Sequence, residues 1–201
     1  MGIDTLTARA VFLDRDGVIN RNVYNRETGA FESPLSPDDA MLHDHVIPAL
    51  QSLQRAGYLL ILVSNQPNCA KGKSTMETLD AIHRRIFAPV EAAGVVFTEV
   101  HYCFHHPAGT VSGYAGVCGC RKPSPKFLLQ DAQKHHLDLT HSWMVGDRDA
   151  DVQCGIAAGV KTIRVKPDYP TKALVEDVHA TFIVEDLLEA ARIILEAKPQ
   201  D

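Results

Sequence analysis

The sequence predicts an α/β protein built on a doubly wound parallel sheet. Short apolar runs, typical of strands buried on both faces, alternate with longer stretches whose apolar residues recur at helical spacing. Several of the short runs stop at polar side chains that suit a loop. Alternation of this kind produces parallel strands joined by right-handed crossovers, so the carboxyl ends of the strands meet at one edge of the sheet. We expect ligands to bind at that edge.

The strands are predicted from runs of β-branched, aromatic and aliphatic residues. The first covers residues 10–13, where Ala-Val-Phe-Leu is an unbroken apolar run. Later runs predict further strands, and polar residues interrupt the run at 95–102. The later strands are expected at residues 58–63, 95–102, 143–145, 161–165 and 181–184.

The helices are predicted from apolar residues spaced three or four positions apart and from capping residues at their ends. Thr75 is placed to begin one helix, and glycine follows three of them. The helices are expected at residues 44–57, 75–94, 123–136, 149–158 and 186–197. The polar segment 22–39 contains two prolines and is predicted to be a loop over the mouth of the first strand.

Length and composition fit one ordinary globular domain. The chain has 201 residues, of which 45% are hydrophobic, enough for a full core in a single domain spanning residues 1–201. A net charge of -5 and the lack of a basic run argue against a nucleic-acid partner. No stretch has the length of a signal peptide core or a membrane span, so we expect a cytoplasmic protein, taken to be monomeric, with no membrane partner.

Two carboxylates follow the first strand. Asp14 and Asp16 are spaced i, i+2 and precede a glycine. Acids this close repel one another unless a cation lies between them or one holds a proton, so the pair indicates a divalent metal ion and a carboxylate that can act as nucleophile or acid. An ordinary Asp-Gly turn is the alternative for this segment taken alone.

Other predicted strand ends and one helix start bring residues that suit a phosphoryl group. Ser64 follows the second strand, Lys122 precedes a helix, and Asp147 follows the fourth strand. Hydrolysis of a phosphate monoester needs a metal, positive charge and a positioned nucleophile together. Asp14 would attack phosphorus, Asp16 would protonate the leaving oxygen and then activate water, and Asp147 would hold Mg²⁺ with Asp14. Ser64 and Lys122 would hold the phosphoryl oxygens.

Four segments resemble the motifs of the haloacid dehalogenase (HAD) phosphatases. They are D-R-D-G-V-I-N at 14–20, S-N-Q at 64–66, C-R-K-P at 120–123 and G-D-R at 146–148, the last continuing to the aspartate at 151. The first and third are similar to the branch that comprises heptose 1,7-bisphosphate phosphatases and histidinol phosphatases. The resemblance implies a HAD-like, Rossmannoid fold. It makes Asp14 the nucleophile and a Mg²⁺ ligand, Asp16 the general acid/base and a ligand through its backbone carbonyl, and Asp147 the remaining ligand.

The resemblance also implies substrate contacts. Ser64 and Lys122 would steady the phosphoryl group, and Arg121 would help to recognise the substrate. Further residues would line the substrate site, and Arg148 would add positive charge beside them. The lining residues are Asn22, Val23, Tyr24, Asn25, Asn65, Gln66 and Pro67.

A second group of residues indicates zinc. Cys103, Cys118 and Cys120 lie close in sequence with two histidines, His105 and His106, after the first of them. Three thiolates and one imidazole form a closed tetrahedral shell, typical of structural zinc in a reducing compartment. Spacing alone leaves the two histidines as alternatives, and the family resemblance names His105. The zinc loop, residues 103–120, would then take the place of a cap domain. The other cysteines, Cys69 and Cys154, are expected to be ordinary loop and core residues.

The length of the zinc loop and the cations near it give information about the substrate. Twelve residues separate His105 from Cys118, more than in the resembling histidinol phosphatases, which favours a small sugar bisphosphate as substrate. The substrate site is expected to contain Lys71, Arg121, Lys122 and Arg148, which together carry more positive charge than one transferred phosphate requires. One segment departs from the family, because residues 65–72 read N-Q-P-N-C-A-K-G where the family has N-Q-S-G-x-A-R-G.

Two other functions remain as alternatives. One is a histidinol-phosphate or other small-molecule phosphatase. The other is a noncatalytic module, either a receiver-like domain phosphorylated on Asp14 or a zinc-ribbon interaction domain. A second acid at Asp16 suits hydrolysis of an aspartyl phosphate better than its storage, and the net negative charge disfavours a ribbon that binds nucleic acid.

Overall fold

The computed structural model describes residues 8–167, 169 and 178–197. Within them a six-stranded parallel sheet has the order β5-β4-β1-β6-β7-β8. The strands are β1 (Arg9–Leu13), β4 (Tyr58–Asn65), β5 (Phe97–Cys103), β6 (Trp143–Gly146), β7 (Lys161–Val165) and β8 (Phe182–Val184). The chain builds outward from β1 through β4 to β5 and then crosses back to β6 on the other side of β1. The strand order therefore reverses beside β1, where ligands of such sheets bind.

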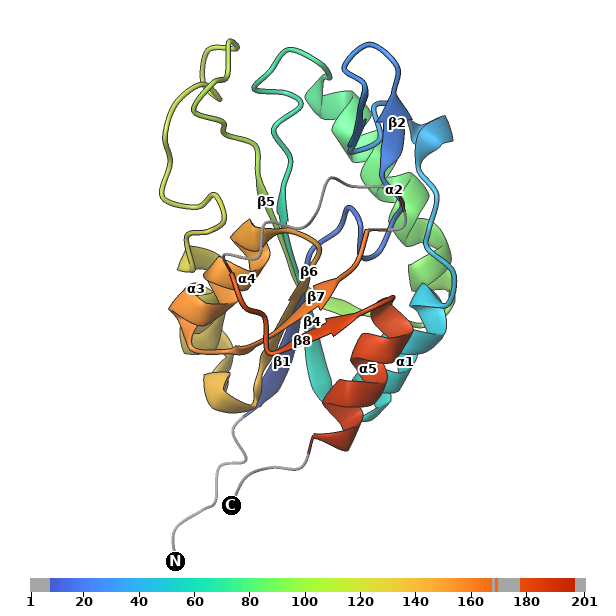
Figure 1. Ribbon diagram of the computed structural model, residues 1–201, viewed down its shortest axis with the longest axis vertical. Helices are drawn as coiled ribbons and strands as arrows, with labels where there is room; N and C mark the ends of the chain where they lie inside the picture. Colours follow the sequence, from blue (N-terminus) through green and yellow to red (C-terminus); the bar gives the residue numbers. More distant parts are fainter. Residues whose placement is uncertain (1–7, 168, 170–177, 198–201) are drawn as a thin grey trace, which may run out of the picture.

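Helices cover both faces of the sheet, which confirms the predicted α/β class. The helices α1, α2 and α5 lie on one face, and α3 and α4 lie on the other (Figure 1). Their bounds are Val46–Arg55 for α1, Met76–Ala92 for α2, Lys126–His135 for α3, Asp149–Ala158 for α4 and Leu187–Glu196 for α5. Thr75 caps α2 as predicted, because its side chain accepts a hydrogen bond from the backbone N–H of Thr78.

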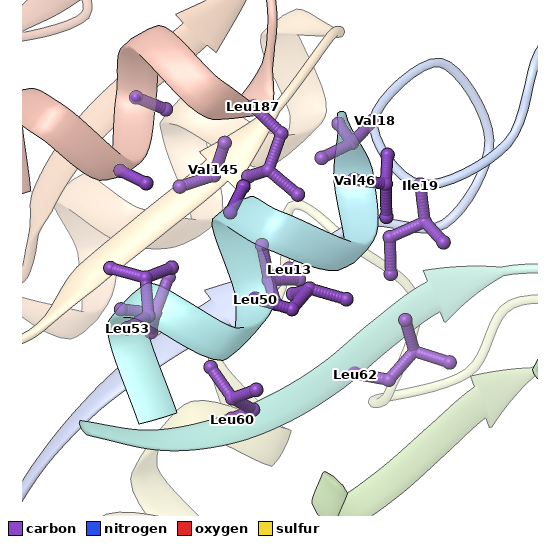
Figure 2. Close-up of a cluster of buried hydrophobic side chains, with 14 of the residues drawn as sticks. Leu13, Val18, Ile19, Val46, Leu50, Leu53, Leu60, Leu62, Val145 and Leu187 are labelled. Atoms are coloured by element: carbon purple, nitrogen blue, oxygen red, sulfur yellow. The ribbon is translucent and has the colours of Figure 1, made fainter. Parts of the chain in front are cut away.

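The core fixes β1 in the middle of the molecule. Its side chains alternate between the two faces, with Leu13 in the cluster under α1, α2 and α5 and Phe12 in the cluster under α3 and α4. Figure 2 shows Leu50 and Leu53 of α1 packed with Leu13 against the sheet. Each of these side chains is fully buried, and burial of one such side chain stabilises the fold by about 1.5–3 kcal/mol. The residues that follow β1 are thereby held rigidly.

The segment 22–39 is more ordered than predicted, so its prediction as a plain loop is wrong. It contains an antiparallel hairpin of β2 (Val23–Asn25) and β3 (Ala30–Glu32), followed by a short 3₁₀ helix, η1 (Pro37–Asp39). The Asn25 side chain closes the turn by accepting hydrogen bonds from the backbone N–H groups of Glu27 and Thr28. Strands of three residues are too short to show a periodic pattern in sequence. The hairpin lies beyond the carboxyl ends of the strands (Figure 1).

Some boundaries differ from the predicted ones by two or three residues. The strand β5 begins at Phe97 rather than residue 95, since Val96 is exposed and its N–H donates to the Gln54 side chain outside the sheet. The helix α1 begins at Val46 because His45 has a left-handed backbone. Pro125 lies at the N-cap of α3, so this helix begins later than predicted. None of the described helices is long and apolar enough to cross a membrane.

Candidate active site

A cavity of about 270 Å³ lies at the carboxyl edge of the sheet. Side chains that follow β1, β4 and β6 line it, together with β3, the loop before α2 and the loop before α3. It is the place where the chain reverses its strand order, as the fold class predicts. Seven of the predicted site residues line the cavity: Asp14, Asp16, Asn65, Pro67, Arg121, Lys122 and Arg148.

Asp14 occupies the base of the cavity. Its backbone N–H donates to the Val145 carbonyl at 3.0 Å, which continues the pairing of β1 with β6 and fixes the residue. Its Oδ1 accepts a hydrogen bond from the Arg15 N–H at 2.7 Å and lies 3.0 Å from Lys122 Nζ. Asp14 Oδ2 accepts no hydrogen bond from any of the described residues, so one oxygen of Asp14 is available to a ligand.

Lys122 is a buried cation beside Asp14. Its ammonium lies 2.6 Å from Asp151 Oδ1 and donates to the Val63 carbonyl at 2.6 Å. Burial by itself lowers the pKa of Lys122, but the carboxylates of Asp14 and Asp151 outweigh it and raise that pKa above its ordinary value. The side chain is therefore charged at neutral pH.

Three buried carboxylates meet around Asp14 and could hold a metal ion. Oxygens of Asp14, Asp147 and Asp151 lie within 4.8 Å of one another. Asp147 Oδ1 is buried without a hydrogen-bond partner in the described residues. Burial, followed by repulsion from Asp14 and Asp151, raises the pKa of Asp147 well above its usual range. A divalent cation would relieve this repulsion, so the donor set fits Mg²⁺.

Asp151, the aspartate that ends the fourth motif, was not predicted as a site residue. Its spacing of four residues from Asp147 was a further signal, and it places Asp151 in the first turn of α4. There its Oδ2 accepts a hydrogen bond from the Arg148 N–H at 3.0 Å, and its other oxygen meets Lys122. An acid in the first turn of a helix is common, so the spacing alone does not separate this residue from an ordinary helix start.

A glycine lets the motif loop approach the carboxylates. A Cβ on Gly17 would lie 2.3 Å from Asp147 Oδ2, and the residue has a left-handed backbone with φ +81°. Any side chain there would force Asp147 or the loop to shift.

Asp16 is held apart from the three clustered carboxylates. Its Oδ1 accepts hydrogen bonds from Arg15 Nη2 at 2.9 Å and Asn20 Nδ2 at 3.0 Å, and its Oδ2 accepts one from Gln66 Nε2 at 2.6 Å. Burial by itself raises the pKa of Asp16, but the Arg15 guanidinium and the two amides bring that pKa below its ordinary value. That the backbone carbonyl of Asp16 binds the metal stays a prediction.

The polar groups of several predicted substrate residues form hydrogen bonds within the protein. Asn65 does line the cavity, yet its amide donates to the Lys122 carbonyl and accepts from the Lys122 N–H, each at 3.1 Å. Gln66 is buried and binds Ser64 Oγ at 3.1 Å in addition to Asp16. Ser64 is also buried and does not line the cavity, so its direct contact with a phosphoryl group stays a prediction.

The predicted segment at 22–25 lies beside the cavity rather than on its wall. Asn22 is buried, and neither of its amide atoms has a hydrogen-bond partner within the described residues. Val23, Tyr24 and Asn25 line a neighbouring hollow of about 320 Å³. The hairpin reaches the cavity through its second strand and the residue after it, by way of Phe31, Glu32 and Ser33, which sequence reasoning missed.

The mouth of the cavity is positively charged. Lys73 is paired with Glu32 at 2.8 Å, whereas no carboxylate of the described residues lies within salt-bridge distance of Lys71. Burial, with the nearby charges of Lys73 and Arg121, lowers the pKa of Lys71. Arg121 donates to the His105 carbonyl at 3.2 Å, and the Arg148 side chain is 56% exposed. The wall therefore has more cations than one anionic group needs.

The predicted zinc ligands lie together at the end of β5. The sulfurs of Cys103, Cys118 and Cys120 are 3.5 Å apart in every pair, and His105 Nδ1 lies 3.9 Å from Cys120 Sγ. Tetrahedral Zn–S bonds of about 2.3 Å place sulfurs about 3.8 Å apart, so the donor set fits Zn²⁺. His106 is outside this cluster, and its ring accepts a hydrogen bond from the Ala108 N–H.

Comparison with known proteins gives concordant matches. Residues 119–190 match the family model described as HAD-hydrolase-like. A D-glycero-β-D-manno-heptose-1,7-bisphosphate 7-phosphatase of Salmonella typhi is 35% identical over 90% of this chain and 92% of its own length. The protein of the same name from Escherichia coli K12 is 37% identical over 76% of each chain.

Solved structures agree with these relatives. The D,D-heptose 1,7-bisphosphate phosphatase of B. bronchiseptica, complexed with magnesium and phosphate, has a TM-score of 0.73 and 28% identity, covering 94% of this chain and 98% of its own. A HAD-like phosphatase from Mesorhizobium loti has a TM-score of 0.76 and 29% identity, covering 96% and 88%. The chain therefore belongs to the HAD-like hydrolases, in the family of the D-glycero-β-D-manno-heptose-1,7-bisphosphate 7-phosphatases.

Proposed function

We propose that this protein is a Mg²⁺-dependent phosphatase that removes the C7 phosphate of D-glycero-β-D-manno-heptose 1,7-bisphosphate. The relatives that are 35–37% identical carry this activity in their names. The observation that carries the proposal is Asp14, which has one oxygen available at the base of a cavity, between the Lys122 ammonium and two further carboxylates. Nucleophile, positive charge and metal donors are thus side by side, as phosphoryl transfer requires.

The residues divide the reaction into two steps. In the first, an oxygen of Asp14 forms a bond to phosphorus as the P–O bond to the sugar breaks. Asp16 has to take up a proton before this step, because its neighbours favour the carboxylate, and it gives that proton to the departing oxygen. In the second, Asp16 takes a proton from water, which attacks phosphorus and frees Asp14 and inorganic phosphate. Lys122 neutralises charge on the phosphoryl oxygens, a role supported by its contact with Asp14.

Both metal sites are part of the proposal. Asp14, Asp147 and Asp151 are the carboxylates placed to hold Mg²⁺ or to order its ligands, and the bound ion would stabilise negative charge on the phosphoryl oxygens. The cluster of three cysteines and His105 would hold a structural Zn²⁺. Because Arg121 and Lys122 follow Cys120 directly, zinc would order the residues that face the substrate. We regard residues 1–201 as one domain that includes this loop.

Gly17→Ala is expected to lower kcat/KM by about 100-fold or more. The added Cβ meets Asp147 Oδ2, and displacement of a catalytic group by an ångström costs about this much. Gly57→Ala is the matched control, since Gly57 has φ +84° and a Cβ there meets nothing within 4 Å. The control should lose about 1–2 kcal/mol of stability and keep its kcat/KM. Equal kinetics for the two variants would contradict the assigned role of Asp147.

A second phosphate would use the surplus cations, so the 1,7-bisphosphate is expected to be hydrolysed with a kcat/KM at least about tenfold higher than the matching 7-monophosphate. Binding of the remote phosphate by Lys71, Arg121 and Arg148 holds the reacting one in line with Asp14, which raises kcat as well as lowering KM. The measurement is phosphate release with Mg²⁺ over phosphorylated sugars and histidinol phosphate.

Substitutions of the cations that line the cavity test whether these residues cause the preference for the bisphosphate. Arg121→Ala and Lys71→Met should reduce the preference for the bisphosphate, whereas Lys134→Ala should not, because Lys134 lies on the outer side of α3 and pairs with Glu99. Equal or faster turnover of the monophosphate or of histidinol phosphate would overturn the proposed substrate. The altered segment 67–71 would then mark a change of specificity within the family.

A further inference from the structure

Gln66 is a buried amide directly behind the cavity. Its neighbours in sequence, Asn65 and Pro67, line the cavity, whereas Gln66 does not and is only 1% exposed. The alternation of side chains at the end of β4 explains the difference. A ligand in the cavity cannot reach this amide, so any part that Gln66 plays in catalysis passes through the residues that it binds.

One of those residues, Asp16, takes part in the proposed mechanism. Gln66 Nε2 donates to Asp16 Oδ2 at 2.6 Å and to Ser64 Oγ at 3.1 Å, and Gln66 Oε1 accepts from Arg15 Nη2 at 2.8 Å. The orientation of the amide follows from chemistry. The reverse orientation would set its oxygen against the Asp16 carboxylate and its NH₂ group against the Arg15 guanidinium.

The two oxygens of the Asp16 carboxylate accept their shortest hydrogen bonds from different residues. Arg15 and Asn20 bind Oδ1, while the shortest contact to Oδ2 comes from Gln66. Arg15 also reaches Oδ2, at the longer distance of 3.2 Å. Rotation of the carboxyl group about its Cβ–Cγ bond would carry Oδ2 away from the Gln66 amide, so this contact, together with those to Oδ1, holds the plane of the group.

The sheet in turn fixes Gln66. Its backbone N–H donates to the Cys103 carbonyl at 2.8 Å, one residue beyond the pairing of Asn65 with Cys103 at the end of β4 and β5. The amide therefore projects from a rigid part of the fold toward Asp16, as a group that orients a catalytic residue must.

We propose that Gln66 is a positioning residue that aims the carboxyl group of Asp16 for proton transfer, an inference that rests on the proposed function of Asp16. In the step concerned, an Asp14 oxygen forms its bond to phosphorus, the P–O bond to the leaving group breaks, and the proton of Asp16 passes to the leaving oxygen. A misaligned Asp16 slows this step only when the leaving oxygen needs the proton.

The test compares two aryl phosphates, phenyl phosphate and p-nitrophenyl phosphate. Phenolate is a strong base and needs the proton, whereas p-nitrophenolate is stable as an anion and does not. The parameter is kcat/KM, since it reports the reaction up to transfer of the phosphoryl group to Asp14. Gln66→Met keeps the size of the side chain and removes the amide. It should lower kcat/KM for phenyl phosphate at least about tenfold, which is part of the roughly 10²–10⁴-fold that a general acid contributes. The loss for p-nitrophenyl phosphate should be less than about threefold.

Double variants show whether Gln66 acts through Asp16. Asp16→Asn should give the same selective loss, and Asp16→Asn combined with Gln66→Met should be no slower than Asp16→Asn alone. Gln51→Met is the matched control, because Gln51 also donates one amide hydrogen bond, at 2.8 Å to the Ala93 carbonyl, at the far end of α2. It should leave both substrates unaffected. Gln66→Asn, whose amide is one methylene too short, provides a second variant with the same expected selectivity should Gln66→Met fold poorly.

Two results would overturn the inference alone. Equal losses for both aryl phosphates in Gln66→Met and Gln66→Asn would indicate a general structural effect. Additive losses in the double variant would indicate a role independent of Asp16. Either result leaves the proposed function intact as long as Asp16→Asn itself is selective for phenyl phosphate. A nonselective Asp16→Asn instead overturns both the inference and the acid role of Asp16.

Discussion

Replacement of Asp14 by asparagine is expected to lower phosphatase turnover by about three powers of ten or more while the protein remains folded. Asparagine has the same shape, but its amide cannot form the bond to phosphorus that the proposed mechanism requires. The fold should tolerate the change because it removes one of three mutually repelling carboxylates beside Asp147 and Asp151. Phosphate release at saturating Mg²⁺ measures the loss, and thermal unfolding with zinc analysis verifies the fold.

The control for this variant removes a carboxylate elsewhere. Asp44 is 82% exposed and pairs with Arg21 at 3.1 Å, so Asp44→Asn should retain full turnover. Residual activity of Asp14→Asn above about a tenth of the wild-type value would contradict the covalent role of Asp14, because loss of a nucleophile costs several powers of ten.

The positions of Asp14 and Ser64 at one edge of the sheet could be predicted from the sequence, because both residues lie at the ends of strands. The apolar run before Asp14 and the run before Ser64 identify buried strands, and parallel strands bring both ends to one edge. The zinc cluster could be predicted for a similar reason, since four soft ligands in a short loop have few other uses.

What the sequence left open depends on side-chain directions and on contacts between distant segments. Asn65 and Gln66 are adjacent and both polar, yet one side chain faces the cavity and the other lies behind it. A lysine before a helix is ordinarily solvated, and only the fold shows that Lys122 is buried between Asp14 and Asp151. The hairpin was missed because a pattern of three residues per strand cannot be distinguished from a polar loop.

Loss of one zinc ligand is expected to remove the metal and to destabilise the whole domain. In Cys120→Ser the zinc content should fall from about one ion per chain toward zero, and the melting temperature should fall by about 10 °C or more. The three sulfurs lie 3.5 Å apart around one position, and two thiolates with one imidazole no longer complete the four-ligand shell of structural zinc. The loop has little apolar packing of its own, as the 89% exposure of Val117 shows, so apparent structural-zinc binding of ~10–16 kcal/mol is comparable with the stability of a domain.

A cysteine-to-serine substitution outside the cluster is the control for Cys120→Ser, because it shows the effect of the substitution without loss of a zinc ligand. Cys154 is buried, and its sulfur donates to the Ser124 carbonyl at 3.2 Å, a contact that a serine hydroxyl can replace. Cys154→Ser should therefore keep its zinc. Mg²⁺ should behave differently from zinc in both variants, because an ion held by a few carboxylates and water exchanges freely and is restored by adding Mg²⁺. Wild-type protein that contains no zinc when prepared without chelator would refute the cluster as a metal site, since a closed thiolate shell retains its ion through purification.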